Sequence, residues 1–253
     1  FRADRAREMT TALTDESFTG FARRVPKLAR FVCLSHYGDA YAHLATAFRN
    51  DPIVNGLGEV LAASHLKQLR IAETEKYAHV TYFFSGGREQ TYPGEDRVLV
   101  PSPKVETYDL KPEMSAPEVT DKLVAAIESK QYAAIICNYA NGDMVGHTGV
   151  LDAAVKAVET LDACLARVLA AARATGAQVL ITADHGNCEQ MFDPASNQAH
   201  TQHTTDKVPL VYVGPEPANV RDGGALRDIA PTLLAMMGLP QPAEMTGRSL
   251  LVA

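Results

Sequence analysis

Short apolar segments alternate with longer amphipathic segments from residue 68 to the end of the chain. The short segments have the length and composition of buried β-strands: 68–72, 97–100, 133–139, 178–183 and 208–213. Such alternation predicts an α/β fold, in which a mostly parallel sheet lies between layers of helices. Ligand sites in these folds gather at the carboxyl ends of the strands. Polar residues next to an apolar segment are therefore the first candidates for function.

The segments between these strands carry helix signals of unequal strength. Ser115 and Glu118 have the spacing of a capping box, and Pro117 suits a first helical turn. Residues 150–173 have the apolar spacing of a long helix. We expect five residues on its inner side: Val155, Val158, Leu165, Val168 and Leu169. Residues 75–84 fit helical spacing but have strand-like composition, so both interpretations stay open.

Other signals divide the chain into parts. Residues 45–56 combine Asn50, Asp51, Pro52 and Asn55-Gly56 with no clear period, which is typical of a linker. Before it we expect a helix at 2–13 and a strand at 29–35. After it we expect short helices at 57–66 and 228–237. The sequence therefore predicts two parts, residues 1–50 and 51–253.

Composition excludes several classes of protein. The 253 residues carry a net charge of -6, which argues against a nucleic-acid-binding protein with a basic stripe. The four cysteines form no CxxC pair, so we expect neither a disulfide framework nor a thiolate zinc site, and a reducing, cytoplasmic setting. Apolar runs are shorter than the ~20 residues that span a bilayer. No feature of the sequence requires an oligomer, so we expect a monomer.

Polar clusters flank three of the expected strands. Asp143 and His147 follow residues 133–139, Asp184 and His185 follow residues 178–183, and His200 and His203 precede residues 208–213. Carboxylate and imidazole together suit Mn²⁺, Zn²⁺ or Fe²⁺ better than Ca²⁺. So many ligands are enough for two metals, which can stabilise both oxygens in a phosphoryl transfer. Any one of these histidines alone is more often an ordinary core or surface residue, but three clusters that all adjoin apolar strands favour a metal site.

Three basic residues are candidates for anion binding. Arg2 and Arg5 lie three apart on an expected helix, so both guanidinium groups can grip one phosphate or carboxylate. They could instead form a solvated face with Asp4 and Glu8. Lys76 follows an expected strand, where an ammonium group can offset charge on a transferring phosphoryl group.

Several of these segments resemble, in order, those of the cofactor-independent phosphoglycerate mutases. The matching segments are FRADRARE, QLRIAETEKYAHVTYFFSGG, SPKVETYDLKPEMS, ICNYANGDMVGHTG, ITADHGNCEQM and AHTQHTT. The match runs from Phe1 almost to Ala253 and corresponds to the C-terminal half of that family's chain. The resemblance implies an alkaline-phosphatase-like domain (51–253), preceded by the end of an inserted α/β transferase domain that binds substrate (1–50).

The resemblance also implies the roles of the candidate residues. Asp143, His147 and His203 match the ligands of one manganese, and Asp184 and His185 match ligands of a second. Arg2 and Arg5 match substrate-binding arginines, and Lys76 matches a lysine of the active site. The implied reaction interconverts 3-phosphoglycerate and 2-phosphoglycerate through a phosphoserine, with two Mn²⁺ and no bisphosphoglycerate.

Two parts of the implied machinery belong to the family's N-terminal region, namely the nucleophilic serine and an aspartate ligand of the second metal. We therefore expect this chain alone to turn over little or no substrate. One rival interpretation is another metallohydrolase or a phosphopentomutase of the same superfamily, which would share the metal clusters. A second rival is a non-enzymatic metal-binding remnant.

Overall fold

The computed structural model describes residues 3–24, 27–48 and 53–252, without the side chains of residues 3–5. The chain divides into two compact units, residues 1–52 and 53–253. The boundary falls inside the segment 45–56 that the sequence marks as a linker.

The first unit is small. Its elements are the helix α1 (Ala3–Thr14), the strands β1 (Val32–Cys33) and β2 (Ala45–Thr46), and the 3₁₀ turn η1 (Asp39–Tyr41). The two strands pair in parallel. The strand expected at 29–35 is therefore present but shorter. Within this unit, Thr11 Oγ1 and the Tyr41 hydroxyl lie 2.7 Å apart, which ties the helix to the segment between the strands.

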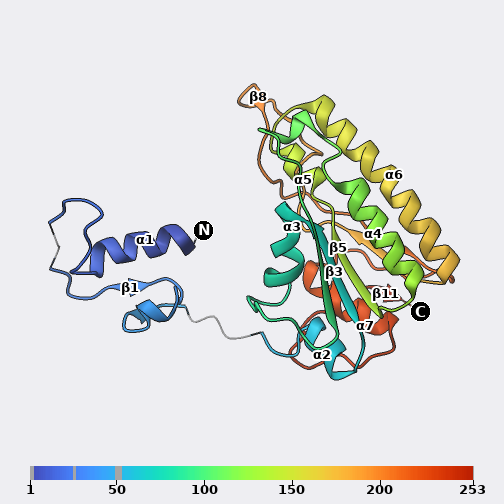
Figure 1. The fold of residues 1–253 in the computed structure, drawn as a ribbon, viewed down its shortest axis with the longest axis horizontal. Helices are drawn as coiled ribbons and strands as arrows, with labels where there is room; N and C mark the ends of the chain where they lie inside the picture. Colours follow the sequence, from blue (N-terminus) through green and yellow to red (C-terminus); the bar gives the residue numbers. More distant parts are fainter. Residues whose placement is uncertain (1–2, 25–26, 49–52, 253) are drawn as a thin grey trace. The chain divides into compact units, whose positions relative to one another are not determined.

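The second unit contains the expected sheet (Figure 1). Its central strand is β3 (Gln68–Glu73), which pairs in parallel with β4 (Glu95–Val100) on one side and β5 (Ala134–Asn138) on the other. The helices are α2 (Leu57–Ala63), α3 (Thr74–Ala78), α4 (Ala116–Ser129), α5 (Asn141–Gly146), α6 (Leu151–Thr175) and α7 (Ile229–Met236). The remaining elements are η2 (His79–Phe83), η3 (Tyr108–Leu110), η4 (Leu226–Asp228), β6 (Val179–Thr182), β7 (Phe192–Asp193), β8 (Gln198–Ala199), β9 (Leu210–Val213), β10 (Asn219–Val220) and β11 (Leu251–Val252).

Helices cover both faces of the sheet, as the sequence predicts. On one face, Leu69 and Ile71 of β3 pack with Val119 and Leu123 of α4 and with Val168 of α6. On the other face, residues of α2 and α7 form a second cluster with the start of β5: Leu57, Leu61, Ala134 and Leu234. Burial of these apolar side chains holds the three layers together. Among the described residues, no helix has both the length and the apolarity needed to cross a bilayer.

The ambiguous segment 75–84 is helical. It forms α3 and continues as the π-helical turn η2. The turn buries Val80 and Thr81, so packing overrides the strand-like composition.

The expected capping box at α4 is wrong. Ser115 stands at the N-cap but makes no capping bond, because its hydroxyl donates to the carbonyl oxygen of Pro101 at 2.7 Å. Ser115 thereby ties the start of α4 to the loop after β4. Pro117 lies in the first turn as expected, and Val119 and Leu123 are buried.

The expected inner face of α6 is only partly right. Val168 is buried, but Val155 and Val158 remain 49% and 50% exposed. The buried positions of α6 are mainly small residues instead: Ala153 and Ala157, which pack with Val145 of α5, and Cys164 and Ala171 further along the helix. The larger apolar residues of α6 lie beside these small ones and form a second apolar stripe.

The expectation of a single mostly parallel sheet also needs correction at β6 and β9. These strands pair antiparallel, with Leu180 opposite Tyr212, and form a separate two-stranded sheet among the described residues. A parallel pair needs a crossover connection, usually a helix. Residues 183–209 between the two strands contain only loops and the short hairpin of β7 and β8.

Candidate metal centre

Asp143 lies at the centre of the candidate site and uses its two carboxylate oxygens differently. Residue 143 is in the first turn of α5, directly after β5 and thus at the carboxyl end of a parallel strand. Oδ2 accepts a hydrogen bond from the buried ammonium group of Lys76. Oδ1 lies 2.9 Å from His203 Nε2 and 3.1 Å from His147 Nε2.

The surroundings of Asp143 keep it ionised. Burial alone would raise its pKa, but the hydrogen bonds from Lys76 and Asn187 and the nearby charges of Lys76 and His147 outweigh that effect. The result is a pKa of about 2. An ionised carboxylate at neutral pH is the form that binds a metal.

His147 follows Asp143 by four residues, at the C-cap of α5, so both side chains lie on one helix face. Its Nδ1 lies 2.7 Å from the carbonyl oxygen of Thr201. A carbonyl can only accept, so Nδ1 donates to it; in the neutral ring that metal binding requires, Nδ1 therefore carries the only proton. The lone pair of Nε2 is then directed toward Asp143 and His203. Hydrogen bonding of this kind fixes the tautomer of metal-binding histidines.

His203 comes from the loop after β8 and completes a triangle of donor atoms. Its Nε2 lies 3.2 Å from His147 Nε2. With metal–ligand bonds of about 2.1 Å, ligand atoms on one face of a coordination sphere are roughly 3–3.4 Å apart. The three atoms of Asp143, His147 and His203 therefore fit one divalent metal ion.

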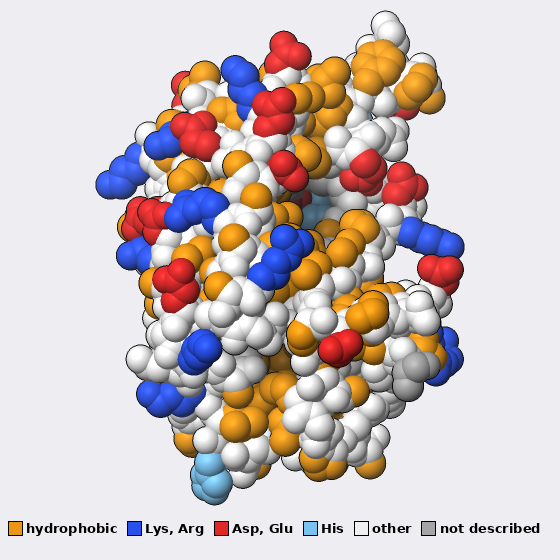
Figure 2. Space-filling view, turned by 90° about the vertical axis from the view of Figure 1, so that its right-hand side faces the viewer, with side chains coloured by type: hydrophobic (Ala, Val, Ile, Leu, Met, Phe, Trp, Pro, Cys, Tyr) orange, Lys and Arg blue, Asp and Glu red, His pale blue; other side chains and the backbone are white. Residues whose placement is uncertain are grey.

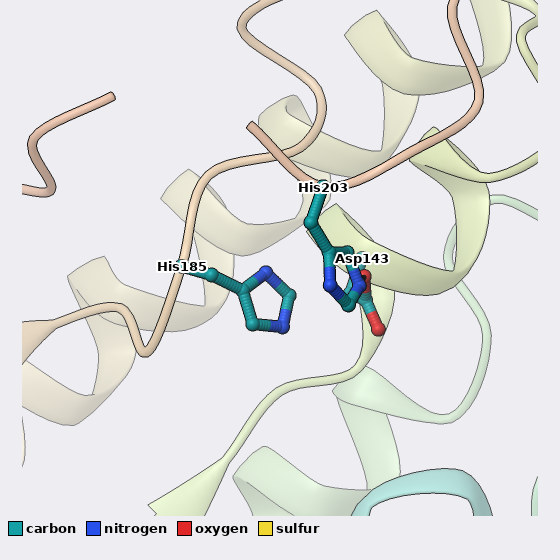
Figure 3. Close-up of side chains that lie close together, drawn as sticks. All are labelled: Asp143, His185 and His203. Atoms are coloured by element: carbon teal, nitrogen blue, oxygen red, sulfur yellow. Dashed lines mark hydrogen bonds and ion pairs between the residues drawn. The ribbon is translucent and has the colours of Figure 1, made fainter. Parts of the chain in front are cut away.

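His185 extends the cluster, and Asp184 stands at its edge. The imidazole ring of His185 stacks on that of His203, with centroids 3.7 Å apart. Ligand atoms of Asp143, His185 and His203 all lie within 4.8 Å of one another, and Figure 3 shows them converging from three segments. Asp184 Oδ2 lies 3.6 Å from His185 Nε2. The geometry thus brings four of the five expected ligands together: Asp143, His147, His203 and His185. The fifth, Asp184, lies beside His185.

Of the expected anion-binding residues, the structure places Lys76 only. Lys76 is carried by α3 and meets Asp143 from the side opposite the histidines. Arg2 lies outside the described residues, and so does the side chain of Arg5, although its backbone belongs to α1.

Several residues of the site were not expected from the sequence. Asn187 donates from its side-chain amide to Asp143 Oδ1 at 2.9 Å. Glu189 accepts a hydrogen bond from the Asn187 backbone amide at 2.7 Å and another from the hydroxyl of Thr204. His79 also lies near the site, where burial and then the charge of Lys76 lower its pKa. The sequence offered one signal for Asn187 and Glu189, namely that they follow the Asp184-His185 pair within a few residues.

Comparison with known proteins places the chain in a family. Residues 31–241 match the Metalloenzyme superfamily, and residues 1–39 match the family described as BPG-independent PGAM N-terminus. The chain is 67% identical over 251 residues, 99% of its length, to the 2,3-bisphosphoglycerate-independent phosphoglycerate mutase of Chromobacterium violaceum. It is 66% identical over 250 residues to the enzyme of the same name from Laribacter hongkongensis.

A solved structure gives the same result. A crystal structure of Leishmania mexicana phosphoglycerate mutase, at low cobalt concentration, matches 97% of this chain with 30% identity and a TM-score of 0.77. The chain spans about half of its relatives, namely 49% of the first two enzymes and 48% of the Leishmania chain. The resemblance to the cofactor-independent phosphoglycerate mutases is thereby confirmed over nearly all of this sequence, and the chain belongs to the Metalloenzyme superfamily.

Proposed function

We propose that the parent protein interconverts 3-phosphoglycerate and 2-phosphoglycerate at a two-manganese site, without bisphosphoglycerate. One observation carries the proposal: the donor atoms of Asp143, His147 and His203 lie 2.9–3.2 Å apart, and Lys76 covers the other oxygen of Asp143. Two relatives that match 99% of the chain are named 2,3-bisphosphoglycerate-independent phosphoglycerate mutase, which supports phosphoglycerate as the substrate.

The donor set fits divalent metals of the Mn²⁺ type, which accept both imidazole and carboxylate ligands. We assign Asp143, His147 and His203 to one metal, and Asp184 and His185 to a second that needs further ligands. A bound metal would supply positive charge that stabilises phosphoryl oxygens and favours ionisation of a serine nucleophile. Lys76 would add its ammonium charge on the other side of Asp143, and Arg2 and Arg5 would hold the glycerate.

The proposed reaction is a relay of one phosphoryl group. The O–P bond of 3-phosphoglycerate breaks as a bond to the serine oxygen forms, which releases a bound glycerate. The 2-hydroxyl of that glycerate then takes the group back and frees the serine. Water must be kept from the phosphoserine during this exchange, because hydrolysis would release inorganic phosphate.

We also propose that residues 51–253 are one part of a larger phosphatase-like domain, and that residues 1–50 end a separate substrate-binding domain. The second apolar stripe of α6 supports the first assignment. It consists of Leu151, Val155, Val158, Leu165 and Leu169, of which the first three are about half exposed. Two hollows lie along it, one shared with Ile181 of β6 and one with Cys188.

The helix that carries the stripe can be found in Figure 1. The helix α6 lies toward the side of Figure 1 that faces the viewer in Figure 2, where hydrophobic side chains reach the surface between charged ones. Exposed apolar stripes of this kind usually mark a contact surface. We propose that the part of the parent protein not spanned by this chain covers it. We further propose a cytoplasmic, monomeric parent enzyme.

A mutase assay on the parent protein tests the proposed function. The substrate is 3-phosphoglycerate with Mn²⁺ and no bisphosphoglycerate, and free phosphate is followed in parallel. We expect 2-phosphoglycerate to appear and EDTA to abolish it. Release of inorganic phosphate alone would make the protein a hydrolase, and binding of Mn²⁺ without any product would make it a non-enzymatic relative.

A further inference from the structure

Asp143 can serve the site only if its carboxylate keeps one orientation. Oδ1 must face the two histidines while Oδ2 faces Lys76. The torsion that rotates an aspartate carboxylate is broad, so rotamer preference alone does not hold this orientation. Lys76 holds Oδ2, and a second group is needed to hold Oδ1.

Asn187 supplies that group. Its side-chain Nδ2 donates to Asp143 Oδ1 at 2.9 Å and to the backbone carbonyl oxygen of Asp143 at 3.2 Å. One amide thus bridges the side chain and the main chain of the same residue. Both partners are acceptors, so the NH₂ end of Asn187 must face Asp143. Asn187 is itself only 4% exposed, and its backbone amide donates to Glu189.

Gly146 provides the space that Asn187 occupies. A Cβ at position 146 would clash with Asn187 Oδ1 and would lie 2.7 Å from its Cγ. Gly146 is buried in α5, where glycine is a poor helix former. The close approach of Asn187 is therefore the physical reason for a glycine here. Gly142, in the same helix, differs: a Cβ there would meet only Cys188 Sγ at an ordinary 3.7 Å.

We propose that Asn187 is a positioning residue of the metal centre, which orients Asp143 for metal binding and depends on the space left by Gly146. The inference rests on the proposed role of Asp143 as a metal ligand, and it does not depend on which reaction the parent enzyme catalyses. Asn187 would act through Asp143 without contacting metal or substrate.

Calorimetric Mn²⁺ binding to this chain tests the inference. Asn187→Leu keeps the branched shape of the side chain and removes both donors. We expect it to weaken Mn²⁺ binding by about 10–100-fold, the usual effect of losing a partner that orients a metal ligand. Gly146→Ala should weaken binding similarly by displacing Asn187. Gly142→Ala is the matched control and should leave Mn²⁺ affinity unchanged.

A double variant separates positioning from a general loss of structure. In Asn187→Ala the side chain that meets position 146 is gone, so adding Gly146→Ala should cost little further Mn²⁺ affinity. Independent effects would instead multiply. The inference is overturned if Asn187→Leu binds Mn²⁺ as the unsubstituted chain does, or if the two effects multiply. A hydrolase result in the mutase assay would leave the inference intact, so the two proposals fail separately.

Discussion

Nδ1 of His147 lies 2.7 Å from the backbone carbonyl oxygen of Thr201, so the loop that carries His203 also orients His147. Thr201 and His203 are two residues apart, and His147 belongs to the end of α5. A further link is the bridge between Thr204 and Gly186, whose backbone amide and carbonyl pair at 3.0 Å. The three polar clusters are therefore coupled through main-chain contacts.

His147→Ala should remove one corner of the donor triangle. We expect Mn²⁺ affinity to fall by more than the 10–100-fold that is typical of losing an indirect partner, because His147 would touch the metal itself. Isothermal titration with Mn²⁺ measures this. His200→Ala, from the same loop as His203, is the control. This variant should bind Mn²⁺ as tightly as the unsubstituted chain does. If His147→Ala bound Mn²⁺ as tightly as the unsubstituted chain, the assignment of His147 as a ligand would be wrong.

Lys76→Met should separate charge stabilisation from metal binding. Lys76 contacts Asp143 Oδ2 and leaves Oδ1 to the histidines, so the variant should still bind Mn²⁺. In the parent enzyme we expect kcat to fall by about 10²–10³-fold, as on losing one donor that stabilises a developing negative charge. The measurements are mutase kinetics at saturating Mn²⁺ and calorimetric Mn²⁺ binding.

The exposed Lys67, which directly precedes β3, offers a control for that experiment. Lys67→Met should change neither kcat nor Mn²⁺ affinity. If kcat of Lys76→Met fell only as far as its bound Mn²⁺ fell, the lysine would support metal binding and would not act on the transferring phosphoryl group.

Much of the site could be predicted from the sequence because parallel strands end at one edge of a sheet. Asp143 follows β5 and Lys76 follows β3, the strand that pairs with β5. Neighbouring strands place the residues that follow them side by side, which is why Lys76 and Asp143 meet. The i, i+4 spacing of Asp143 and His147 on a helix works in the same way.

The remainder of the site could not be read from residue types. Asn187 follows a glycine after a strand, where an asparagine is ordinarily a turn residue. Thr201 contributes a backbone carbonyl, which every residue has. The direction of β6 and β9 and the exposure of Val155 and Val158 depend on tertiary contacts. Apolar spacing identifies the faces of a helix but not the partner that each face packs against.

The apolar stripe of α6 should respond differently in this chain and in its parent. Val158 is 50% exposed here, so Val158→Lys should change the unfolding free energy of this chain by no more than about 0.5 kcal/mol. In the parent, where we propose that the stripe is covered, the same change should cost roughly 1.5–3 kcal/mol, the value of burying a valine. Urea unfolding followed by circular dichroism measures both.

Lys156 belongs to the same helix and is exposed on a different side of it. Lys156→Ser should have little effect on unfolding in either protein, which controls for changes in helix propensity. Equal small effects of Val158→Lys in both proteins would mean that the stripe stays exposed in the parent.

Asp228 should make the stability of the second unit depend on acid pH. Its carboxylate accepts hydrogen bonds from the backbone amides of Arg248 at 2.9 Å and Ala225 at 2.8 Å, and these bonds lower its pKa. Because the folded-state pKa lies below the unfolded value of about 3.9, the stabilisation is present above that pH and is lost as pH falls through the folded pKa. Asp228→Asn removes the charge and replaces one of the two acceptor oxygens with an NH₂ donor, so one backbone amide loses its acceptor. We expect it to lower the unfolding free energy at pH 7 by roughly 1–3 kcal/mol, the usual cost for a buried hydrogen bond to a charged group.

The difference between Asp228→Asn and the unsubstituted chain should begin to shrink below about pH 4, where the unfolded aspartate takes up a proton, and should be smallest once the pH has fallen through the folded pKa. Thermal unfolding of both proteins from pH 7 down to pH 2.5, with Asp222→Asn as an exposed control, measures this difference. Asp222→Asn should follow the unsubstituted chain throughout. A stability gap for Asp228→Asn that stays constant across this range would show that the residue acts through packing alone, since a packing contribution does not depend on ionisation of the carboxyl group.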